Sequence, residues 1–535
     1  MSNLPKKYVP LVIGFSLATG IILGGWMAGS TGGGLKIPAN KNKQKLINLI
    51  SYIEKDYVDE VNIDSIVSVT TNSILEKLDP HSTYISKNDF SGVKERMRGN
   101  IVGIGISYYQ LQDTIAVIHT LPNGPSKKAG LLPGDRILMA NNDTLFGKNL
   151  TADEVAGFIK GKIDTEVHLQ VKRQGEPDLL DFTLKRDIVP IKSVDAGFML
   201  NEELAYIKIN RFSETTAAEF KHQLRKLKKQ NPEGIILDLR NNTGGYLREA
   251  IEIADEFLEK NTPILFTKNR SGKTKESYAQ SNGMFEEGEL YVLINEKTAS
   301  ASEVIAGAMQ DNDRGWIIGR RSYGKGLVQK EMNLGDGSAV RLTTSRYYTP
   351  SGRSIQRPYQ NGSKSYFNQY HHRFTNGELK EKDSIPINDS LQFETKNGRI
   401  VYGGGGIVPD VFVPQSNDLQ NDYEFMYQGG VMDRFVFDFM EKNRSYYNQL
   451  SFEEFQQENE QFTQNMIQEF EDSLNELNFS YDFSEQSPIL KNYLKAVLAK
   501  QLFDDEKSLQ IKLHFDPMVE SVLKHYQKSE ELNPI

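Results

Sequence analysis

The sequence predicts an α/β core with an inserted β-rich domain, a helical segment before it and a helical extension after it. Three observations support this prediction. Between residues 187 and 420, short apolar runs typical of buried strands alternate with amphipathic stretches of helical period. Between residues 96 and 186, the apolar runs are separated by turns that contain glycine and proline. Residues 38–95 and 421–535 instead carry apolar side chains at helical spacing.

The composition of the chain excludes several classes of protein and site. A chain of 535 residues is too long for a single hydrophobic core and indicates several domains. It contains no cysteine, which excludes a cysteine nucleophile, thiolate metal sites and disulfides. The net charge of −8 argues against nucleic acid as a partner, because no basic surplus is present to neutralise phosphates. No motif in the sequence indicates a cofactor or a metal site.

The N-terminus predicts export and a membrane anchor. Lys6 and Lys7 precede an apolar run over residues 8–29, close to the ~20 residues that span a bilayer. The lysines predict that residues 1–7 are a cytoplasmic tail, and a glycine-rich linker follows the run at residues 30–37. We therefore expect an anchor in a bacterial inner membrane, with the rest of the chain in the periplasm. A cleaved signal peptide is the alternative.

Two helices and a turn are expected in residues 38–95. Apolar side chains recur at helical spacing over residues 46–57 and again over residues 63–78. The second helix ends at an Asp-Pro turn that contains His81. We interpret His81 as part of a structural turn rather than as a ligand or a base, because no partner motif lies near it.

Residues 96–186 contain a segment with a specific pattern. A short helix stops at Gly130, a Pro-Gly turn follows, and a strand begins at Ile137. The run over residues 129–137 resembles a PDZ domain, and the resemblance implies a module that binds the C-termini of peptides. Backbone N–H groups of a glycine loop can hold a carboxylate while the peptide adds a strand to a sheet edge. A plain glycine-bearing hairpin is the alternative. The tail-binding loop would be Gly103, Ile104, Gly105 and Ile106.

The core segment begins with two apolar strands. Residues 234–240 lead through an Asn-Asn-Thr-Gly-Gly loop into an amphipathic helix over residues 246–258. Residues 291–294 form the next strand and lead into a helix that begins near Ser300. A polar insertion interrupts the core at residues 359–400. It contains a His-His pair, which we interpret as part of a solvated loop, because no clustered carboxylates or cysteines accompany His371 and His372.

The parts of a serine–lysine site for acyl transfer follow the second strand, and three residues supply them. Ser300 lies at a helix start, Lys325 lies between two glycines, and Gln329 follows four residues later. Lysine can deprotonate a serine hydroxyl when burial lowers its pKa from ~10.4 towards ~7–8. The Gln329 amide would orient the amine without adding a charge. Ser300 also begins a capping box with Glu303, so a purely structural helix cap is the alternative.

An oxyanion hole is expected beside the serine. The N–H of Ala301 lies at the start of the helix, where the helix dipole favours negative charge. A second donor would come from Gly244 or Gly245, in the loop that follows the first strand.

Two other motifs do not carry a function. Gly319 to Lys325 has the spacing of a phosphate-binding loop, but Gly326 stands where that loop needs Ser or Thr. Ser91 and Lys94 have Ser-x-x-Lys spacing but lack its companion motifs.

Taken together, residues 40–415 resemble the C-terminal processing proteases, also called tail-specific proteases. The resemblance rests on several separate motifs, which are the Leu-Asp-Pro-His-Ser turn at 78–82, the PDZ segment, Asp-Leu-Arg-Asn-Asn-Thr-Gly-Gly at 238–245, Ser-Ala-Ser-Glu at 300–303, Gly-Lys-Gly-Leu-Val-Gln at 324–329 and Gly-Ile-Val-Pro-Asp at 406–410.

This resemblance implies roles for the candidate residues. Ser300 would be the nucleophile, Lys325 the general base and Gln329 its orienting residue, and the family's spacing selects Ser300 over Ser302. The core would be related to crotonases and Clp-type proteases, and the PDZ domain would recruit the substrate's tail. Thr243 departs from the Pro or Gly that the family often has. The insertion at 359–400 and the helices past 425 lie outside the common core and receive no role.

The sequence thus predicts a membrane-tethered serine endopeptidase that cleaves proteins near exposed C-terminal tails, without a cofactor. A homo-oligomer is compatible with the sequence. The alternative is a membrane-tethered PDZ adaptor or sensor with a latent protease core. Acyl-CoA chemistry on a crotonase-like core has no support, because a serine–lysine pair is not needed there.

Overall fold

The computed structural model describes residues 41–111, 114–148, 150–416, 418–447, 449–457, 460–476 and 487–532. The chain divides into two compact units, residues 1–73 and residues 74–535. The predicted cytoplasmic tail, membrane anchor and linker at residues 1–37 lie outside the described residues. Within the described ranges, no helix combines the length and the apolar character needed to cross a membrane.

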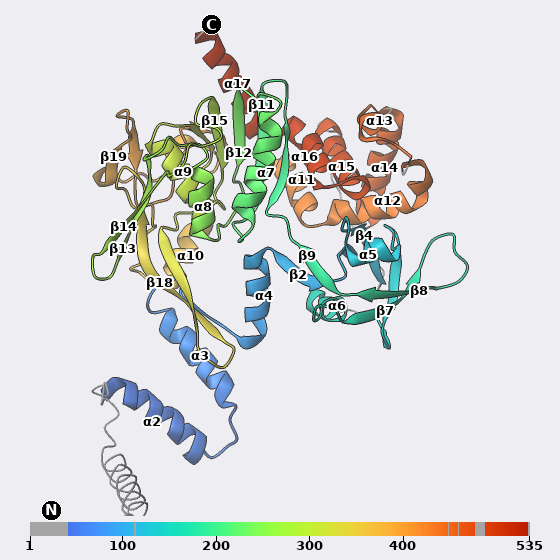
Figure 1. Cartoon of the computed structure of the whole chain (residues 1–535), viewed down its shortest axis with the longest axis horizontal. Helices are drawn as coiled ribbons and strands as arrows, with labels where there is room; N and C mark the ends of the chain where they lie inside the picture. Colours follow the sequence, from blue (N-terminus) through green and yellow to red (C-terminus); the bar gives the residue numbers. More distant parts are fainter. Residues whose placement is uncertain are drawn as a thin grey trace, which may run out of the picture. The chain divides into compact units, whose positions relative to one another are not determined.

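The first unit contains helix α2 (Lys41–Asp56) and most of helix α3 (Ile63–Leu75) (Figure 1). Helix α2 is amphipathic, yet none of its residues is buried. The second unit begins with the last residues of α3, and in the turn that follows the Asp79 carboxylate accepts the backbone N–H groups of His81 and Ser82, each at 2.8 Å. Strand β1 (Thr83–Ile85) and helix α4 (Lys87–Arg98) follow this turn.

The β-rich domain is built of short antiparallel strands around its own core. Its main sheet has the order β3-β4-β5-β7-β8, with β6 paired to β5, so β3 is an edge strand. Strand β2 pairs separately with β9, which closes the domain where the chain enters and leaves it. Its elements are β2 (Asn100–Gly103), β3 (Ile106–Leu111), β4 (Thr114–Thr120), α5 (Pro125–Ala129), β5 (Arg136–Ala140), β6 (Asp143–Thr144), α6 (Ala152–Ile159), β7 (Glu166–Lys172), β8 (Leu180–Lys185) and β9 (Asp187–Pro190).

The core domain is a sheet covered by helices on both faces. The strand order is β10-β11-β12-β15-β16-β21, and the pairs from β11 onward are parallel. Alternate side chains of these strands pack against α7, α8 and α9 on one face and against α17 on the other. The elements are β10 (Val194–Met199), β11 (Leu204–Ile209), α7 (Thr216–Lys228), β12 (Gly234–Asp238), α8 (Leu247–Ala254), β15 (Glu289–Ile294), α9 (Ala301–Asp311), β16 (Trp316–Gly319), β21 (Val411–Phe412) and α17 (Pro517–Leu532).

A second sheet of the core carries the segment that follows Lys325. It has the order β1-β18-β13-β14, and β17 pairs with β18. The polar insertion forms helix α10 (Ser363–His372) and short elements after it. His371 and His372, expected in a loop, instead lie exposed in the last turn of this helix. The remaining elements are β13 (Pro263–Asn269), β14 (Thr274–Tyr278), β17 (Leu327–Asn333), β18 (Ala339–Tyr348), η2 (Lys382–Ser384), η3 (Asp389–Leu391), β19 (Gln392–Glu394) and β20 (Ile400–Tyr402).

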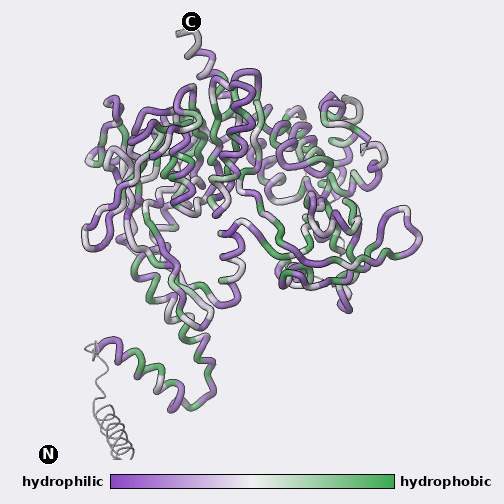
Figure 2. Tube along the Cα trace, in the orientation of Figure 1, coloured by the Kyte–Doolittle hydropathy of each residue, from purple (hydrophilic) through white to green (hydrophobic). Residues whose placement is uncertain are grey.

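The C-terminal extension is helical and has an apolar core of its own, to which α11, α12, α14 and α15 contribute. Figure 2 shows apolar residues along the inner strands of the molecule and polar residues along its outer loops. The predicted architecture, an α/β core with a β-rich insertion and helical segments at both ends, is confirmed. The helices of the extension are α11 (Asp418–Gln428), α12 (Val431–Tyr447), α13 (Phe452–Gln456), α14 (Glu460–Glu476), α15 (Ser487–Leu502), α16 (Asp505–Lys512) and η4 (Leu513–Phe515), followed by α17.

Candidate active site

Ser300 lies at the turn between strand β15 and helix α9 and has an unusual backbone. Its φ of 57° and ψ of −114° are rarely adopted by a residue with a side chain. A serine held in a strained turn before a helix projects its hydroxyl away from the backbone, as activated serines do in other hydrolases. The turn therefore provides more than a helix cap.

Glu303 connects the serine turn to the lysine loop. It is fully buried, and its Oε2 accepts the backbone N–H groups of Ser300 (2.8 Å) and Lys325 (2.9 Å). Its Oε1 accepts the Gly324 N–H (2.7 Å) and the Ser322 hydroxyl (2.5 Å). Burial raises the pKa of Glu303, and these hydrogen bonds oppose the rise only in part. One carboxylate thus fixes the main chain on both sides of the site.

Lys325 has the environment that a lysine base needs. Its Nζ donates a hydrogen bond to Gln329 Oε1 at 2.9 Å. Burial and the positive charge of Arg341 lower its pKa to about 8, although Glu303 and Asp79 oppose the shift. The pairing of strand β17 with β18 shifts its register between Val328 and Gln329. The side chains of Lys325 and Gln329 are nevertheless in contact.

The other end of the Gln329 amide is held by the turn at His81. Gln329 Nε2 donates to the backbone carbonyl oxygen of His81 at 2.6 Å, which leaves Oε1 facing Lys325. Burial and the charge of Lys325 lower the pKa of His81 to about 3, so its ring is neutral at physiological pH. His81 lies in a structural turn, as expected, and its carbonyl also holds Gln329, a contact that the sequence does not indicate.

The glycine loop after β12 lies directly against the serine turn. A Cβ added to Gly244 would lie 2.8 Å from Ser300 Cβ and 3.0 Å from Ala301 N. The Gly244 N–H is already donated to Asn242 Oδ1 at 2.8 Å. Among the described residues, no acceptor is bonded to the N–H of Gly245 or of Ala301. Of the two glycines considered from sequence, Gly245 therefore has the available donor.

Known proteins resemble this chain in three segments. Residues 203–361 match peptidase family S41, residues 102–184 match the PDZ domain, and residues 423–504 match a family of unknown function. A “Probable CtpA-like serine protease” of Staphylococcus aureus strain N315 is 32% identical over 355 residues, covering 65% of this chain and 70% of the relative. This chain belongs to peptidase family S41. Its predicted family is confirmed, and the protein is a serine protease of the C-terminal processing type.

Two further relatives are similar to this S41 peptidase. A “Probable CtpA-like serine protease” of Staphylococcus epidermidis strain ATCC 12228 is 32% identical over 355 residues, covering 65% of this chain and 70% of the relative. The solved structure of the photosystem II D1 C-terminal processing protease is 25% identical, covers 70% of this chain and 86% of its own, and has a TM-score of 0.37.

The predicted tail-binding residues of the S41 peptidase lie in its PDZ domain, whereas Ser300 and Lys325 belong to the core domain. Gly103 ends β2, and Ile106 begins the edge strand β3. Between them, Ile104 is buried and its carbonyl accepts both the N–H and the hydroxyl of Ser126. Gly105 has a φ of 75°, which turns the chain into β3. Within the described part of the chain, the N–H groups of Ile104 and Gly105 have no bonded acceptor.

The rival serine and the phosphate-loop motif have structural roles in the S41 peptidase. Ser302 is fully buried, and its hydroxyl donates to the Asn242 carbonyl at 3.0 Å, so it anchors the glycine loop. In the segment from Gly319 to Lys325, the N–H groups of Gly324 and Lys325 are donated to Glu303, and a strand follows. A phosphate-binding loop would instead keep its N–H groups for the phosphate and lead into a helix.

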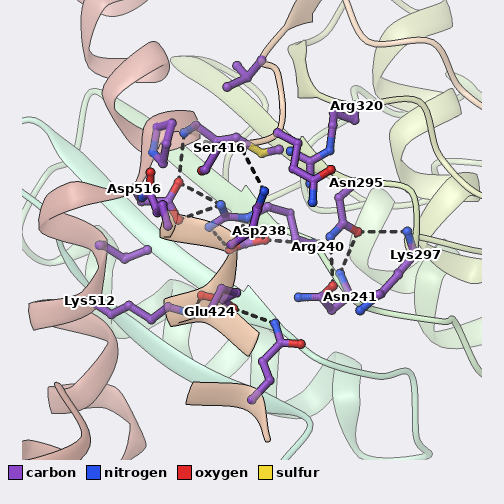
Figure 3. A pocket seen from close by; sticks show the side chains of 18 of the residues that line it. Asp238, Arg240, Asn241, Asn295, Lys297, Arg320, Ser416, Glu424, Lys512 and Asp516 are labelled. Carbon is purple, nitrogen blue, oxygen red and sulfur yellow. Dashed lines mark hydrogen bonds and ion pairs between the residues drawn. The ribbon is translucent and has the colours of Figure 1, made fainter. Parts of the chain in front are cut away.

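A polar pocket of about 370 Å³ lies at the carboxyl ends of β12 and β15, on the side of the C-terminal helices (Figure 3). Asn241 and Asn295 line it and exchange two hydrogen bonds of 3.0 and 2.9 Å, which join the glycine loop to the serine loop. Arg240 lies between Asp238 and Asp516, each at 2.7 Å. Burial opposes ionisation of Asp238, but Arg240 and Lys208 outweigh it and hold the pKa of Asp238 far below its usual range. The sequence pattern gave no sign of this pocket.

Proposed function

We propose that this S41 protease cuts proteins near exposed C-terminal tails with Ser300 as nucleophile, Lys325 as general base and Gln329 as its orienting residue. The observation that carries the proposal is the shared carboxylate of Glu303, which joins the backbone of Ser300 to that of a lysine whose pKa lies near 8. Such a lysine is substantially neutral just above that pH and can accept a proton.

The reaction would proceed through an acyl-enzyme. Ser300 Oγ attacks the carbonyl carbon while its proton passes to Lys325 Nζ. The resulting oxyanion receives hydrogen bonds from the N–H groups of Ala301 and Gly245. The C–N bond then breaks as Lys325 returns the proton to the departing amine. A water molecule, deprotonated by Lys325, then attacks the ester carbonyl. The bond between this carbon and Ser300 Oγ breaks as Lys325 returns the proton to Oγ, and the new C-terminus leaves as a carboxylate.

Two features support recognition of the tail. The N–H groups of Ile104 and Gly105, which have no bonded acceptor within the described residues, would suit a carboxylate, and the edge of β3 would suit an added peptide strand. We place the protease domain on the exported side of the membrane, in the periplasm, because of the lysines and apolar run over residues 6–29. Proteolysis of intact spheroplasts would test this, since the catalytic part should be degraded while cytoplasmic proteins survive.

The catalytic assignment is tested with full-length protein and casein as an unstructured substrate. Ser300→Ala should abolish cleavage, while Ser302→Ala should keep Ser300-dependent labelling by a fluorophosphonate. Cleavage that persists in Ser300→Ala would remove the assignment.

Tail recognition is tested separately with one peptide in two forms. The peptide with a free C-terminal carboxylate should be cut faster than its amidated form, because the amide loses the charge that the PDZ loop would bind. Equal rates would remove the PDZ domain from substrate recognition. Binding of the peptide with the free C-terminal carboxylate, without any turnover, would favour the adaptor alternative.

A further inference from the structure

Insertion 359–400, to which the family resemblance assigns no role, contacts the residues that hold Lys325. Its helix α10 packs against the turn at His81 and against the loop that leads to the lysine. An inference about this insertion rests on the proposed function, because it concerns how the proposed base is oriented.

The first contact runs from Tyr366 to Gln329 through His81. Tyr366 is buried, and its hydroxyl lies 3.0 Å from His81 Nε2, with the two rings edge to face at 5.2 Å. The His81 N–H is donated to Asp79, and its carbonyl accepts Gln329 Nε2 at 2.6 Å. The hydroxyl of Tyr366 therefore fixes a residue whose carbonyl holds the amide next to the base.

The second contact runs through Arg357. Its buried guanidinium lies over the rings of Tyr366 at 4.0 Å and Tyr323 at 4.5 Å, while its Nε and Nη2 find no hydrogen-bond partner among the residues that the structure describes. The aromatic faces stabilise the buried charge. The backbone N–H of Arg357 is donated to the carbonyl of Gly324, the residue before Lys325, at 3.0 Å. Gly324 has a φ of 88°, and an added Cβ would lie 2.6 Å from Arg357 Cγ.

The third contact anchors the same loop from the end of α10. Arg373 is buried and donates to the carbonyls of Ser322 (2.9 Å) and Arg321 (2.5 Å). Glu378 binds both Arg321 and Arg373, at 2.7 and 2.9 Å. Since the Ser322 hydroxyl is donated to Glu303, the insertion is continuous with the carboxylate that joins Ser300 and Lys325.

We propose that insertion 359–400 positions the general base, and that Tyr366, acting through His81, keeps the Gln329 amide turned so that Oε1 faces Lys325. An amide has an acceptor end and a donor end. If it reversed, its NH₂ group would face the lysine amine, which would lose its acceptor, and the ammonium form would be disfavoured. Tyr366 is a positioning residue, because it reaches the base only through His81 and Gln329.

The charges around Lys325 allow this role to be measured. Arg341, Glu303 and Asp79 are the charged groups that act on it, and none of them changes in the variants below. The His81 ring is neutral at physiological pH, so its contact with Tyr366 does not titrate in the working range. The acid limb of the pH profile therefore reports on Lys325.

The test is Tyr366→Phe in the full-length protein, which removes the hydroxyl and keeps the ring over Arg357. Loss of the hydroxyl's contact with His81 should lower kcat/KM on casein and the rate of Ser300 labelling by a fluorophosphonate about 3- to 10-fold. KM should not change, and the midpoint of the acid limb should move to lower pH. The control is Tyr359→Phe, which makes the same chemical change at a hydroxyl that contacts only Arg346 in the described structure, at 3.2 Å, and should match the wild type.

The outcomes separate this inference from the proposed function. If wild-type Ser300 is not labelled, or its labelling does not depend on pH between 6 and 10, the proposed dyad fails whatever the variants do. If the wild type shows the acid limb but Tyr366→Phe equals Tyr359→Phe, or loses rate without a shift of the midpoint, the positioning role is overturned.

Discussion

Ser300 keeps its unusual backbone because both of its peptide groups are held. Its N–H is bonded to Glu303, and its carbonyl accepts the hydroxyl of Tyr347 at 3.2 Å. Strain of this kind persists only where the surroundings fix it. The helix cap and the candidate nucleophile are thus one feature, because the Glu303 side chain that completes the capping box also holds Ser300 in its unusual conformation.

Glu303→Gln tests this at the residue scale. A glutamine has a single acceptor oxygen, so its NH₂ group must face two of the four donors that now meet the carboxylate. We expect kcat to fall about 10- to 100-fold and the protein to be less stable, because hydrogen bonds to charged groups are lost. Casein cleavage and thermal unfolding measure the two effects, and wild-type values of both would contradict the role given to Glu303.

Lys325 should contribute activity at the expense of stability. Its folded pKa of about 8 lies below the ordinary value of 10.5, so the unfolded chain binds the extra proton between these values and stability rises with pH across that window. At pH 7 the unfavourable burial amounts to roughly 3 kcal/mol. We expect Lys325→Met to be inactive yet more stable at pH 7, with a gain that shrinks towards pH 10. Denaturant unfolding at both pH values measures this, and a less stable variant at pH 7 would refute it.

Sequence reasoning could propose the side chains of the candidate site but not their backbone partners. Ser300, Lys325 and Gln329 could be proposed because their residue types and spacing are specific to one chemistry. The His81 carbonyl that holds Gln329 could not, since a main-chain acceptor carries no signature of residue type. The choice of Gly245 over Gly244 depends on where the Asn242 side chain turns, which a sequence does not specify.

At the scale of elements, Asn242 organises the loop between β12 and α8. Its Nδ2 donates to the Ile209 carbonyl, its Oδ1 accepts the Gly244 N–H, and its own carbonyl accepts both the Ala299 N–H and the Ser302 hydroxyl. The loop is thereby fixed to β11 and to the start of α9. Asn242 therefore has a structural reason to stand at this position of the loop.

Gly245→Ala tests the packing of this loop. Gly245 has a φ of 149°, and an added Cβ would lie 2.1 Å from the carbonyl oxygen of Phe212, so the loop must move. We expect loss of detectable cleavage. The matched control is Gly272→Ala, where φ is 82° but nothing lies within 4 Å, and only stability should fall, by about 1 kcal/mol. Equal activity in the two alanine variants would show that the loop position does not matter.

At the scale of the whole second unit, the C-terminal extension contacts both the PDZ domain and the core. On the PDZ side, Arg136 pairs with Glu441 at 2.7 Å, and the His119 ring contacts the Lys500 carbonyl. On the core side, α17 covers one face of the sheet and Asp516 binds Arg240. The sequence indicated the helices but not their role, because an amphipathic pattern does not specify which surface a helix covers.

The Arg240–Asp516 pair is where the extension meets the segment that leads into the loop with Gly245. Asp516 also accepts the N–H groups of Met518 and Val519 at the start of α17, so Asp516→Asn can keep the helix cap through Oδ1 while an NH₂ group faces the guanidinium. Because Arg240 precedes the loop that carries Gly245, we expect kcat on casein to fall about tenfold with little change in KM. Glu520→Gln, which removes an exposed pair with Lys524 on the same helix, should have no effect. If both variants cleave casein like the wild type, the extension stabilises the sheet without acting on the site.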